Sequence, residues 1–256
     1  MSANEDRQFP EGMEPLGKNT FSFSCHAGVS CFTHCCRKLE LFLYPYDIIR
    51  LKKALNIDSE EFLNRYAGVV QGQNPFFPSL ILRMLTNDQN TCPFLGDKGC
   101  RVYEDRPSSC RTYPLERAVE RHASGRPEEF YFMTEHDYCK GHAEDKEWIV
   151  KDWLQDQHLL YYNMMDDLWA EMDTLFRSNP WMREGAAGPR QQVAFLVCYN
   201  IDGFRRYCHD QQIWRQFKLS KSEVRSMETD DEALLRFGYK WLRFILANEP
   251  TLTSRK

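Results

Sequence analysis

The sequence predicts an α+β fold: a small cysteine-rich domain with short strands and helices, followed by a mostly α-helical C-terminal region. Eight of the ten cysteines lie between Cys25 and Cys139, within a part of the chain that mixes short strand and helix patterns. From about Glu144 onward the pattern turns helical and rich in Trp, Tyr and Met. We therefore expect a polar lead-in at 1–20, a cysteine-rich domain at 21–143 and a helical region at 144–256.

Short elements follow one another in the cysteine-rich part. Alternating leucines in KLELFLYP (38–45) predict a strand, and Pro45 opens a helix through YDIIRLKKAL. Asp58 with Glu61 is a capping pattern that starts a second helix, SEEFLNRYAG. PLERAVE and EEFYFMTE, separated by RHASGRP, predict a hairpin with a longer loop.

The C-terminal region reads as a series of helices. Met165, Leu168, Met172 and Leu175 recur at the spacing of an amphipathic helix, which ends near Pro180. A helix from Pro189 to about Asp210 follows.

Two capping-box patterns predict the last two helix starts. Ser220 with Glu223 marks one, and Thr229 with Glu232 marks the other, before ALLRFGYKWLRFILA.

Composition and charge exclude several classes of protein. Hydrophobic content of 42% and charged content of 27% exclude a wholly disordered chain. A net charge of -4 argues against a protein built around nucleic-acid phosphates, so no nucleic-acid partner is expected. The start, MSANEDRQFPEGMEP, lacks the pattern of a signal peptide, and no apolar run reaches the ~18 residues that span a membrane. We expect a cytoplasmic protein without a membrane partner.

The early segment SCHAGVSCFTHCC raises the question of the chemical state of its cysteines. Disulfides, buried inert thiols and metal-bound thiolates are the three alternatives. In a reducing compartment, a cysteine framework points to metal or redox chemistry. Buried free cysteine remains the alternative for any single position.

The eight cysteines between residues 25 and 139 suit metal binding. Several stand in loop-type sequence with Pro and Gly, where the backbone can turn sulfur atoms inward. Two sets of four would serve two tetrahedral zinc sites or two cubane clusters, and one filled site beside structural thiols is the other arrangement. The candidate metal ligands are Cys25, Cys31, Cys35, Cys36, Cys92, Cys100, Cys110 and Cys139.

The adjacent pair Cys35–Cys36 sets a geometric constraint. Neighbouring side chains point to opposite faces of a strand and diverge by about 100° on a helix. We therefore predict that the two thiols lie in two different environments.

These residues and their spacing resemble the CxxCxxCC (YkgJ-like) family of zinc- or iron-chelating domains. The resemblance covers residues 22–142 and includes the final Cys-Cys, LYPYDIIRL, and a block from Cys92-Pro93-Phe94-Leu95 to Cys110-Arg-Thr-Tyr-Pro. The first block here, C-x5-C-x3-CC, is wider than the family's C-x2-C-x2-CC. The resemblance implies a metal or iron–sulfur site, and some relatives are flagellin lysine N-methylases that carry a cluster.

An all-cysteine ligand set fits both zinc and an iron–sulfur cluster. On family grounds we favour a [4Fe–4S] cluster, with zinc as the alternative. Arg106 and Arg111 flank Cys110 and are candidates to contact an anionic cluster, against the alternative of surface or structural ion pairs. His142, at C-x2-H spacing from Cys139, is a further candidate ligand or hydrogen-bond donor.

Three functions follow as hypotheses. The first is a cytosolic metal-cluster protein of a redox or protein-modifying system, with a redox partner or a protein substrate. The second is a protein N-methyltransferase of the flagellin-methylase type, although no nucleotide-binding fingerprint is present. The third is a zinc-stabilised binding module without catalysis. No catalytic residue is assigned. Cys198 and Cys208 are predicted to be core or partly exposed thiols.

Overall fold

The computed structural model describes residue 9 and residues 14–121, 127–182, 184–185 and 187–255. Most of the predicted polar lead-in lies outside the described residues. Helices and short strands both occur, and helices dominate after residue 150, which confirms the α+β fold class. None of the described helices is long and apolar enough to cross a membrane.

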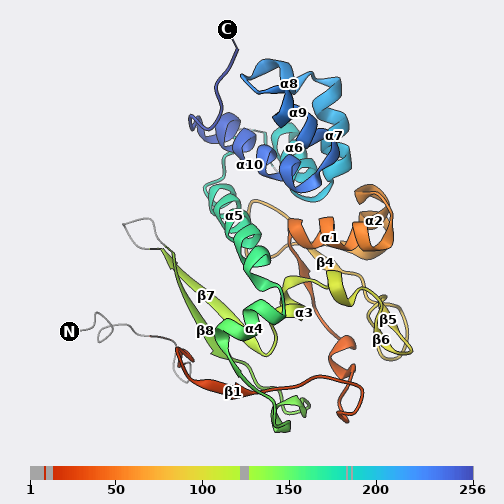
Figure 1. Cartoon of the computed structure of the whole chain (residues 1–256). Coiled ribbons are helices and arrows are strands. Elements are labelled where there is room, and N and C mark those ends of the chain that lie inside the picture. Colours follow the sequence, from red (N-terminus) through yellow and green to blue (C-terminus); the bar gives the residue numbers. More distant parts are fainter. Residues whose placement is uncertain (1–8, 10–13, 122–126, 183, 186, 256) are drawn as a thin grey trace, which may run out of the picture. The chain divides into compact units, whose positions relative to one another are not determined.

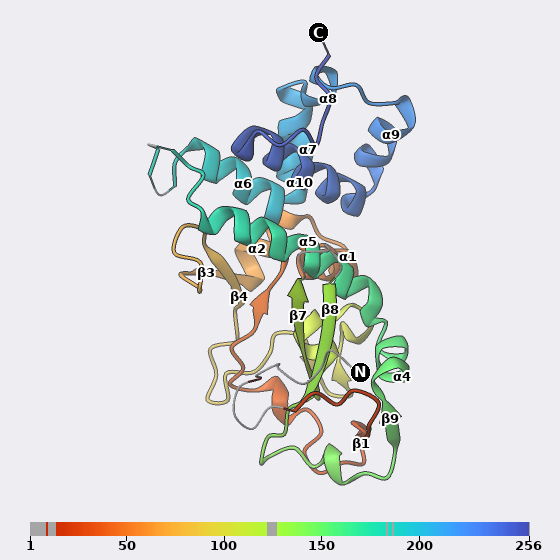
Figure 2. The same cartoon turned by 90° about the vertical axis from the view of Figure 1, so that its left-hand side faces the viewer.

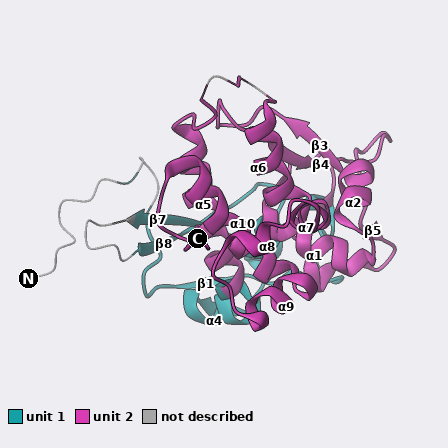
Figure 3. Cartoon of the chain, turned by 90° about the horizontal axis from the view of Figure 1, so that it is seen from above, with its two compact units in different colours: residues 1–35, 108–160 teal, residues 36–107, 161–256 magenta. Residues whose placement is uncertain are grey.

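The chain divides into two compact units (Figure 3). Unit 1 contains residues 1–35 and 108–160, and unit 2 contains residues 36–107 and 161–256. This division differs from the expected boundaries, because each unit takes segments from both sides of residue 143 and unit 1 also continues across residue 21. The predicted domain boundaries remain a prediction, since compact units and domains of a family need not coincide.

Unit 1 is built on two antiparallel strand pairs (Figures 1 and 2). Strands β7 (Leu115–Arg121) and β8 (Pro127–Met133) form the predicted hairpin, with Leu115 opposite Met133. Strand β1 (Thr20–Ser22) pairs with β9 (Glu147–Ile149). The remaining elements are the short helix α3 (Ser108–Thr112), the 3₁₀ turn η3 (Gly141–Ala143) and helix α4 (Val150–Asp156).

A small aromatic core holds these elements together. Trp153 of α4 makes edge contacts with Phe21 and Phe23, at 6.0 and 5.6 Å between ring centroids. The Trp153 indole N–H also donates to the carbonyl oxygen of Thr112 at 3.1 Å. The pairing of residues 20–22 with residues 147–149 therefore brings the early cysteine segment beside the chain that follows Cys139.

Unit 2 combines small sheets with most of the helices. The three-stranded sheet has the order β2 (Phe42–Leu43), β4 (Ser79–Leu82), β3 (Ala67–Val70), all antiparallel, and β5 (Leu95–Gly96) pairs with β6 (Gly99–Cys100). The helices are α1 (Pro45–Leu55), α2 (Ser59–Tyr66), α5 (Leu159–Arg177), α6 (Pro189–Tyr199), α7 (Ile201–Asp210), α8 (Ile213–Gln216), α9 (Lys221–Thr229) and α10 (Asp231–Ala247). The first two residues of α5 belong to unit 1.

Sequence capping signals account for most of these helix starts. Asp58 accepts the Glu61 backbone N–H at 2.8 Å at the start of α2, and Ser220 with Glu223 forms a complete capping box at α9. Two expectations were wrong. The helix expected over 189–210 breaks at Asn200, whose side chain caps α7 through the Gly203 N–H. The last helix is capped by Asp230 rather than by Thr229, which ends α9.

Buried charges join the helices of unit 2. Lys52 of α1 lies between Asp202 of α7 and Asp231 of α10, with Nζ–O distances of 2.7 and 2.8 Å. Arg205 pairs with the same two carboxylates. Asp202 also accepts the backbone N–H of Ser59 at 2.8 Å. The network thus contacts four helices, α1, α2, α7 and α10.

Candidate metal centre

The eight candidate ligands are shared between the two units. Unit 1 contains Cys25, Cys31, Cys35, Cys110 and Cys139, and unit 2 contains Cys36, Cys92 and Cys100. The boundary falls between the adjacent cysteines Cys35 and Cys36, within the 3₁₀ turn η1 (His34–Cys36). All eight are at least partly exposed, so metal can reach them. By contrast, Cys198 and Cys208 are buried in the core of unit 2.

Three cysteines of unit 1 gather around one tyrosine. Burial raises the pKa of Tyr138, and the charges of Cys35, Cys139 and Cys31 raise it further. The Lys140 backbone N–H donates to Cys31 Sγ at 3.1 Å, which ties the early cysteine segment to the loop after Cys139. Cys31, Cys35 and Cys139, which we call the unit 1 sulfur group, are therefore close in space despite 104 to 108 positions of sequence separation between the first two and the third.

Tyr113 lies near the same cysteines. Burial raises the pKa of Tyr113, and a hydrogen bond with Cys139 and the charges of Cys139, Tyr138 and Cys35 add to this effect. Its hydroxyl oxygen lies 3.1 Å from His142 Nε2. Tyr113 therefore stays protonated at neutral pH and provides an O–H group next to a sulfur ligand candidate.

A stack of rings borders the unit 1 sulfur group. Tyr113 stacks on His136 with 5.7 Å between ring centroids and an angle of 2°, and His136 stacks on Tyr138 at 5.0 Å. His34 continues the series beyond Tyr138 at 4.9 Å. The rings hold the segment 134–140 against the η1 turn.

The backbone of the Cys139 loop is closely packed. Cys139 N–H donates to the His136 carbonyl oxygen at 2.8 Å, and Ser24 N–H donates to the Gly141 carbonyl oxygen at 3.0 Å. A Cβ atom at Gly141 would lie only 2.7 Å from the Ser24 carbonyl oxygen, so glycine alone fits here. The Ser24–Gly141 pairing also brings Cys25 next to the Cys139 loop.

A second set of cysteines occurs in unit 2. Cys92 N–H donates to the Cys36 carbonyl oxygen at 2.8 Å, and the neighbouring residues Arg37 and Thr91 form a β-bridge. The Leu95 N–H donates to the Cys92 carbonyl oxygen at 3.0 Å, and Leu95 pairs with Cys100 in the β5–β6 hairpin. Cys36, Cys92 and Cys100 therefore lie on connected backbone segments, and we call them the unit 2 sulfur group.

The two arginines have well-defined protein contacts. The Arg106 guanidinium stacks over the Tyr103 ring at 3.7 Å and donates to the Tyr103 carbonyl oxygen. Arg111 is 1% exposed and donates to the carbonyl oxygen of Gln157 at 2.7 Å. These contacts fix both side chains within their own units. A contact of either arginine with a cofactor remains a prediction.

His26, which follows Cys25, differs from His142 in its contacts. His26 Nδ1 accepts the Gly28 N–H at 3.1 Å, and its Nε2 lies 3.1 Å from a Glu144 carboxylate oxygen. His142 is partly withdrawn from solvent, which lowers its pKa, and it contacts Tyr113. The sequence suggested that His142 is either a metal ligand or a hydrogen-bond donor. The structure gives it a hydrogen-bond partner, the Tyr113 hydroxyl.

The chemistry of these donors fits a thiolate-bound metal. Among the described residues, no three His, Cys, Asp or Glu side chains are already arranged around a common metal position. Yet Cys31 Sγ accepts the Lys140 backbone N–H at 3.1 Å. Hydrogen bonds to sulfur favour the thiolate, which is the form that binds metal.

Cys198 and Cys208 have the opposite environment. Burial raises the pKa of both thiols well above the ordinary value, so they remain protonated at neutral pH. They lie on α6 and α7 among apolar neighbours. The prediction that they are core thiols is confirmed.

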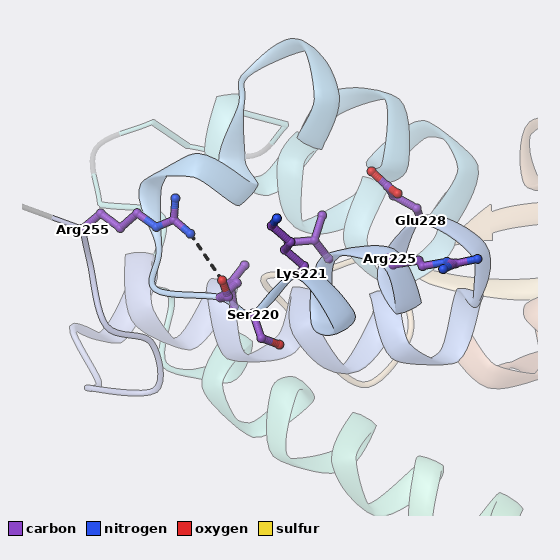
Figure 4. A pocket seen from close by; sticks show the side chains of 7 residues that line it. Ser220, Lys221, Arg225, Glu228 and Arg255 are labelled. Carbon is purple, nitrogen blue, oxygen red and sulfur yellow. Dashed lines mark hydrogen bonds between the residues drawn. The ribbon is translucent and has the colours of Figure 1, made fainter.

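A surface pocket of about 360 Å³ lies in the helical part of unit 2 (Figure 4). Ser220, Lys221, Arg225, Glu228 and Arg255 contribute to its lining, together with apolar residues. Arg255 donates to the Leu219 carbonyl oxygen at 3.3 Å. Its lining residues include no cysteine or histidine, so this pocket is separate from the sulfur groups.

Tyr113 is the residue that sequence reasoning missed. Its position in the Cys-Arg-Thr-Tyr-Pro block was noted, but no role followed from it. The spacing of residues along the sequence does not show which hydroxyl group lies near which sulfur atom in the folded chain. The contact depends on the β7–β8 hairpin, which returns the chain from residue 115 to residue 133 beside its start.

The cysteine-rich region is similar to a known family of domains. Residues 24–140 match the family model CxxCxxCC, described as "Putative zinc- or iron-chelating domain". This region is thus similar to the CxxCxxCC family, as the resemblance indicated. No curated protein and no solved structure matches the chain. A metal-chelating function is therefore supported for residues 24–140.

Proposed function

We propose that this chain binds iron as a [4Fe–4S] cluster through four thiolates of unit 1: Cys25, Cys31, Cys35 and Cys139. The contact between the early cysteine segment and the Cys139 loop carries the proposal, since the Lys140 N–H donates to Cys31 Sγ at 3.1 Å. Cys25 is the fourth ligand, because the backbone pairing of Ser24 with Gly141 holds it beside the Cys139 loop. An all-sulfur set of four is the usual ligand set of such a cluster.

Hydrogen bonding supports this assignment. Four thiolates give a cluster a net negative charge, and N–H and O–H groups directed at sulfur stabilise that charge. Unit 1 supplies such a donor from the Lys140 backbone. The cluster would act in electron transfer or support a protein-modifying reaction, with a redox partner or a protein substrate.

The unit 2 sulfur group remains a candidate ligand set of a second metal, and Cys110 of unit 1 remains a candidate ligand without an assigned site. Three thiolates leave one position of a tetrahedral site for another ligand. We assign no catalytic residue, and methyl transfer rests on family kinship alone, which does not establish a function.

Anaerobic purification tests this proposal. We expect a brown protein with a broad visible absorption, containing iron and acid-labile sulfide in equal amounts, as a [4Fe–4S] cluster does. The metal content of the same sample is measured by elemental analysis. A colourless protein with stoichiometric zinc and no sulfide would overturn the cluster and support a zinc-stabilised module.

A further inference from the structure

We infer that the surface pocket on α9 is a docking site for an acidic segment of a partner protein, one that combines carboxylates with an apolar side chain. The pocket has a volume of about 360 Å³, and its lining comes from α9, from the residues just before this helix and from Arg255 (Figure 4). The inference does not depend on the proposed metal centre, because no cysteine contributes to this lining.

Backbone pairing holds Arg255 against the chain that leads into α9. Phe217 and Ser254 form an antiparallel bridge, and the Arg255 N–H donates to the Gln216 carbonyl oxygen at 2.8 Å. The Arg255 guanidinium donates to the Leu219 carbonyl oxygen at 3.3 Å. Because a guanidinium carries five N–H donors, this bond positions the group and leaves other donors for a carboxylate of a ligand.

Lys221 and Arg225 add two more cations from α9. They lie one helical turn apart, and four residues of helix rise by about 6 Å, so two carboxylates of one segment can each meet one cation. Within the part of the chain that the structure describes, neither side chain has an ion pair, and Glu228 pairs with neither. The lining thus carries three cations against one carboxylate, although the whole chain has a net charge of -4.

Other acidic residues around α9 already have partners. Glu223 closes the capping box with Ser220, and Asp230 caps α10. Asp231 lies 2.8 Å from the Lys52 ammonium group. These carboxylates are committed to the fold, so the positive charge of the pocket remains available to a ligand.

The N-terminus of α9 is not a site for a compact anion. The Glu223 N–H donates to the Ser220 hydroxyl oxygen at 3.1 Å, and the Glu223 carboxylate accepts the Ser220 N–H at 2.8 Å. A phosphate bound at a helix N-terminus uses free N–H groups and a positive dipole end, but here a carboxylate already stands at that end. Binding therefore depends on the side chains spread along the pocket.

Apolar lining favours a protein segment over a polyphosphate. Leu219 and Val224 line the pocket and are partly buried against the core of unit 2, which fixes them in place. Figure 4 shows Arg255 on one side of the pocket and Arg225 with Glu228 on the other, with Lys221 between them. The Glu228 carboxylate would repel the closely spaced phosphates of a nucleic acid. An acidic segment with an apolar side chain matches both the charge and the apolar lining.

The first test measures binding of the full chain to a short fluorescein-labelled peptide of Glu, Asp and Leu by fluorescence anisotropy. We expect a dissociation constant on the order of 10–100 µM, which rises more than about fivefold as the salt concentration increases from about 50 to about 500 mM. Peptides with Gln and Asn in place of the acids should bind more than about tenfold more weakly, and peptides with Ser in place of Leu more than about threefold.

A pair of matched variants locates the site. Arg225→Glu reverses one cation of the pocket and should weaken binding of the acidic peptide more than about tenfold. Lys53→Glu reverses an exposed cation of α1, outside the pocket, and makes the same change in net charge. It should change the affinity less than about twofold, and circular dichroism with thermal unfolding checks that both variants fold.

Each outcome supports or overturns the inference. Absence of binding, equal losses in Arg225→Glu and Lys53→Glu, or equal binding of the neutral peptide would overturn it. Single-stranded DNA and phosphatidylserine vesicles serve as competitors; if either binds more tightly than the peptide and depends on Arg225, the assignment to a protein partner is wrong. Iron content is not involved in any of these measurements, so a failure here is distinct from a failure of the proposed function.

Discussion

Replacing Cys35 with serine is expected to remove most of the bound iron, lowering the iron content per chain more than about tenfold. Cys35 belongs to the unit 1 sulfur group, and a hydroxyl group is a poor substitute for a thiolate in an all-sulfur site. Iron and sulfide are measured after anaerobic purification. Cys198→Ala is the control, because that thiol is buried in the core of unit 2 and stays protonated.

Cys36→Ser is the sharper comparison. Although Cys36 is the next residue, its carbonyl oxygen accepts the Cys92 N–H, and it belongs to the unit 2 sulfur group. We expect this variant to retain the iron–sulfur cluster and its visible spectrum. Identical loss of iron and identical spectra from the Cys35 and Cys36 variants would contradict two separate environments.

Replacing Asp202 with asparagine is expected to reduce the free energy of unfolding by about 3 kcal/mol, because Lys52 and Arg205 would lose a shared buried carboxylate. Lys52 is only 8% exposed, so its charge depends on such partners. Urea denaturation measures the change. Glu60→Gln is the matched control: its exposed ion pair with Arg206 also joins α2 and α7, and its loss should cost less than about 1 kcal/mol.

The contribution of the Asp202 carboxylate to the free energy of unfolding depends on pH. Burial alone would raise the pKa of Asp202, but hydrogen bonds from Lys52 and Ser59 outweigh it and hold the pKa below its ordinary value. A lowered folded-state pKa gives stability that is fully present above the unfolded pKa of about 3.9. That stability is lost as the pH falls through the folded value. The difference between wild type and Asp202→Asn should therefore shrink in acid; a difference that stays constant would exclude this network as its cause.

Local signals predicted local structure well. Pro45, Asp58 and Ser220 mark helix starts because each satisfies or avoids backbone N–H groups within its own turn. The exceptions have local causes too. The Asp230 carboxylate accepts two backbone N–H groups of α10, while the Thr229 hydroxyl donates to the Arg225 carbonyl oxygen within α9.

Long-range pairing could not be predicted in the same way. The β1–β9 pairing joins residues more than a hundred positions apart, and it helps to bring the Cys139 loop to Cys31. The divergence of the Cys35 and Cys36 side chains was predicted from backbone geometry and stays a prediction. The ligand roles of the eight cysteines remain a prediction.

X-ray absorption at the iron edge of the purified protein tests the central claim, thiolate ligation of the metal, most directly. We predict a first shell of sulfur alone at about 2.3 Å, the usual metal–thiolate length, with iron neighbours beyond it. A first shell of nitrogen and oxygen at about 2.0–2.2 Å would contradict ligation by the cysteines.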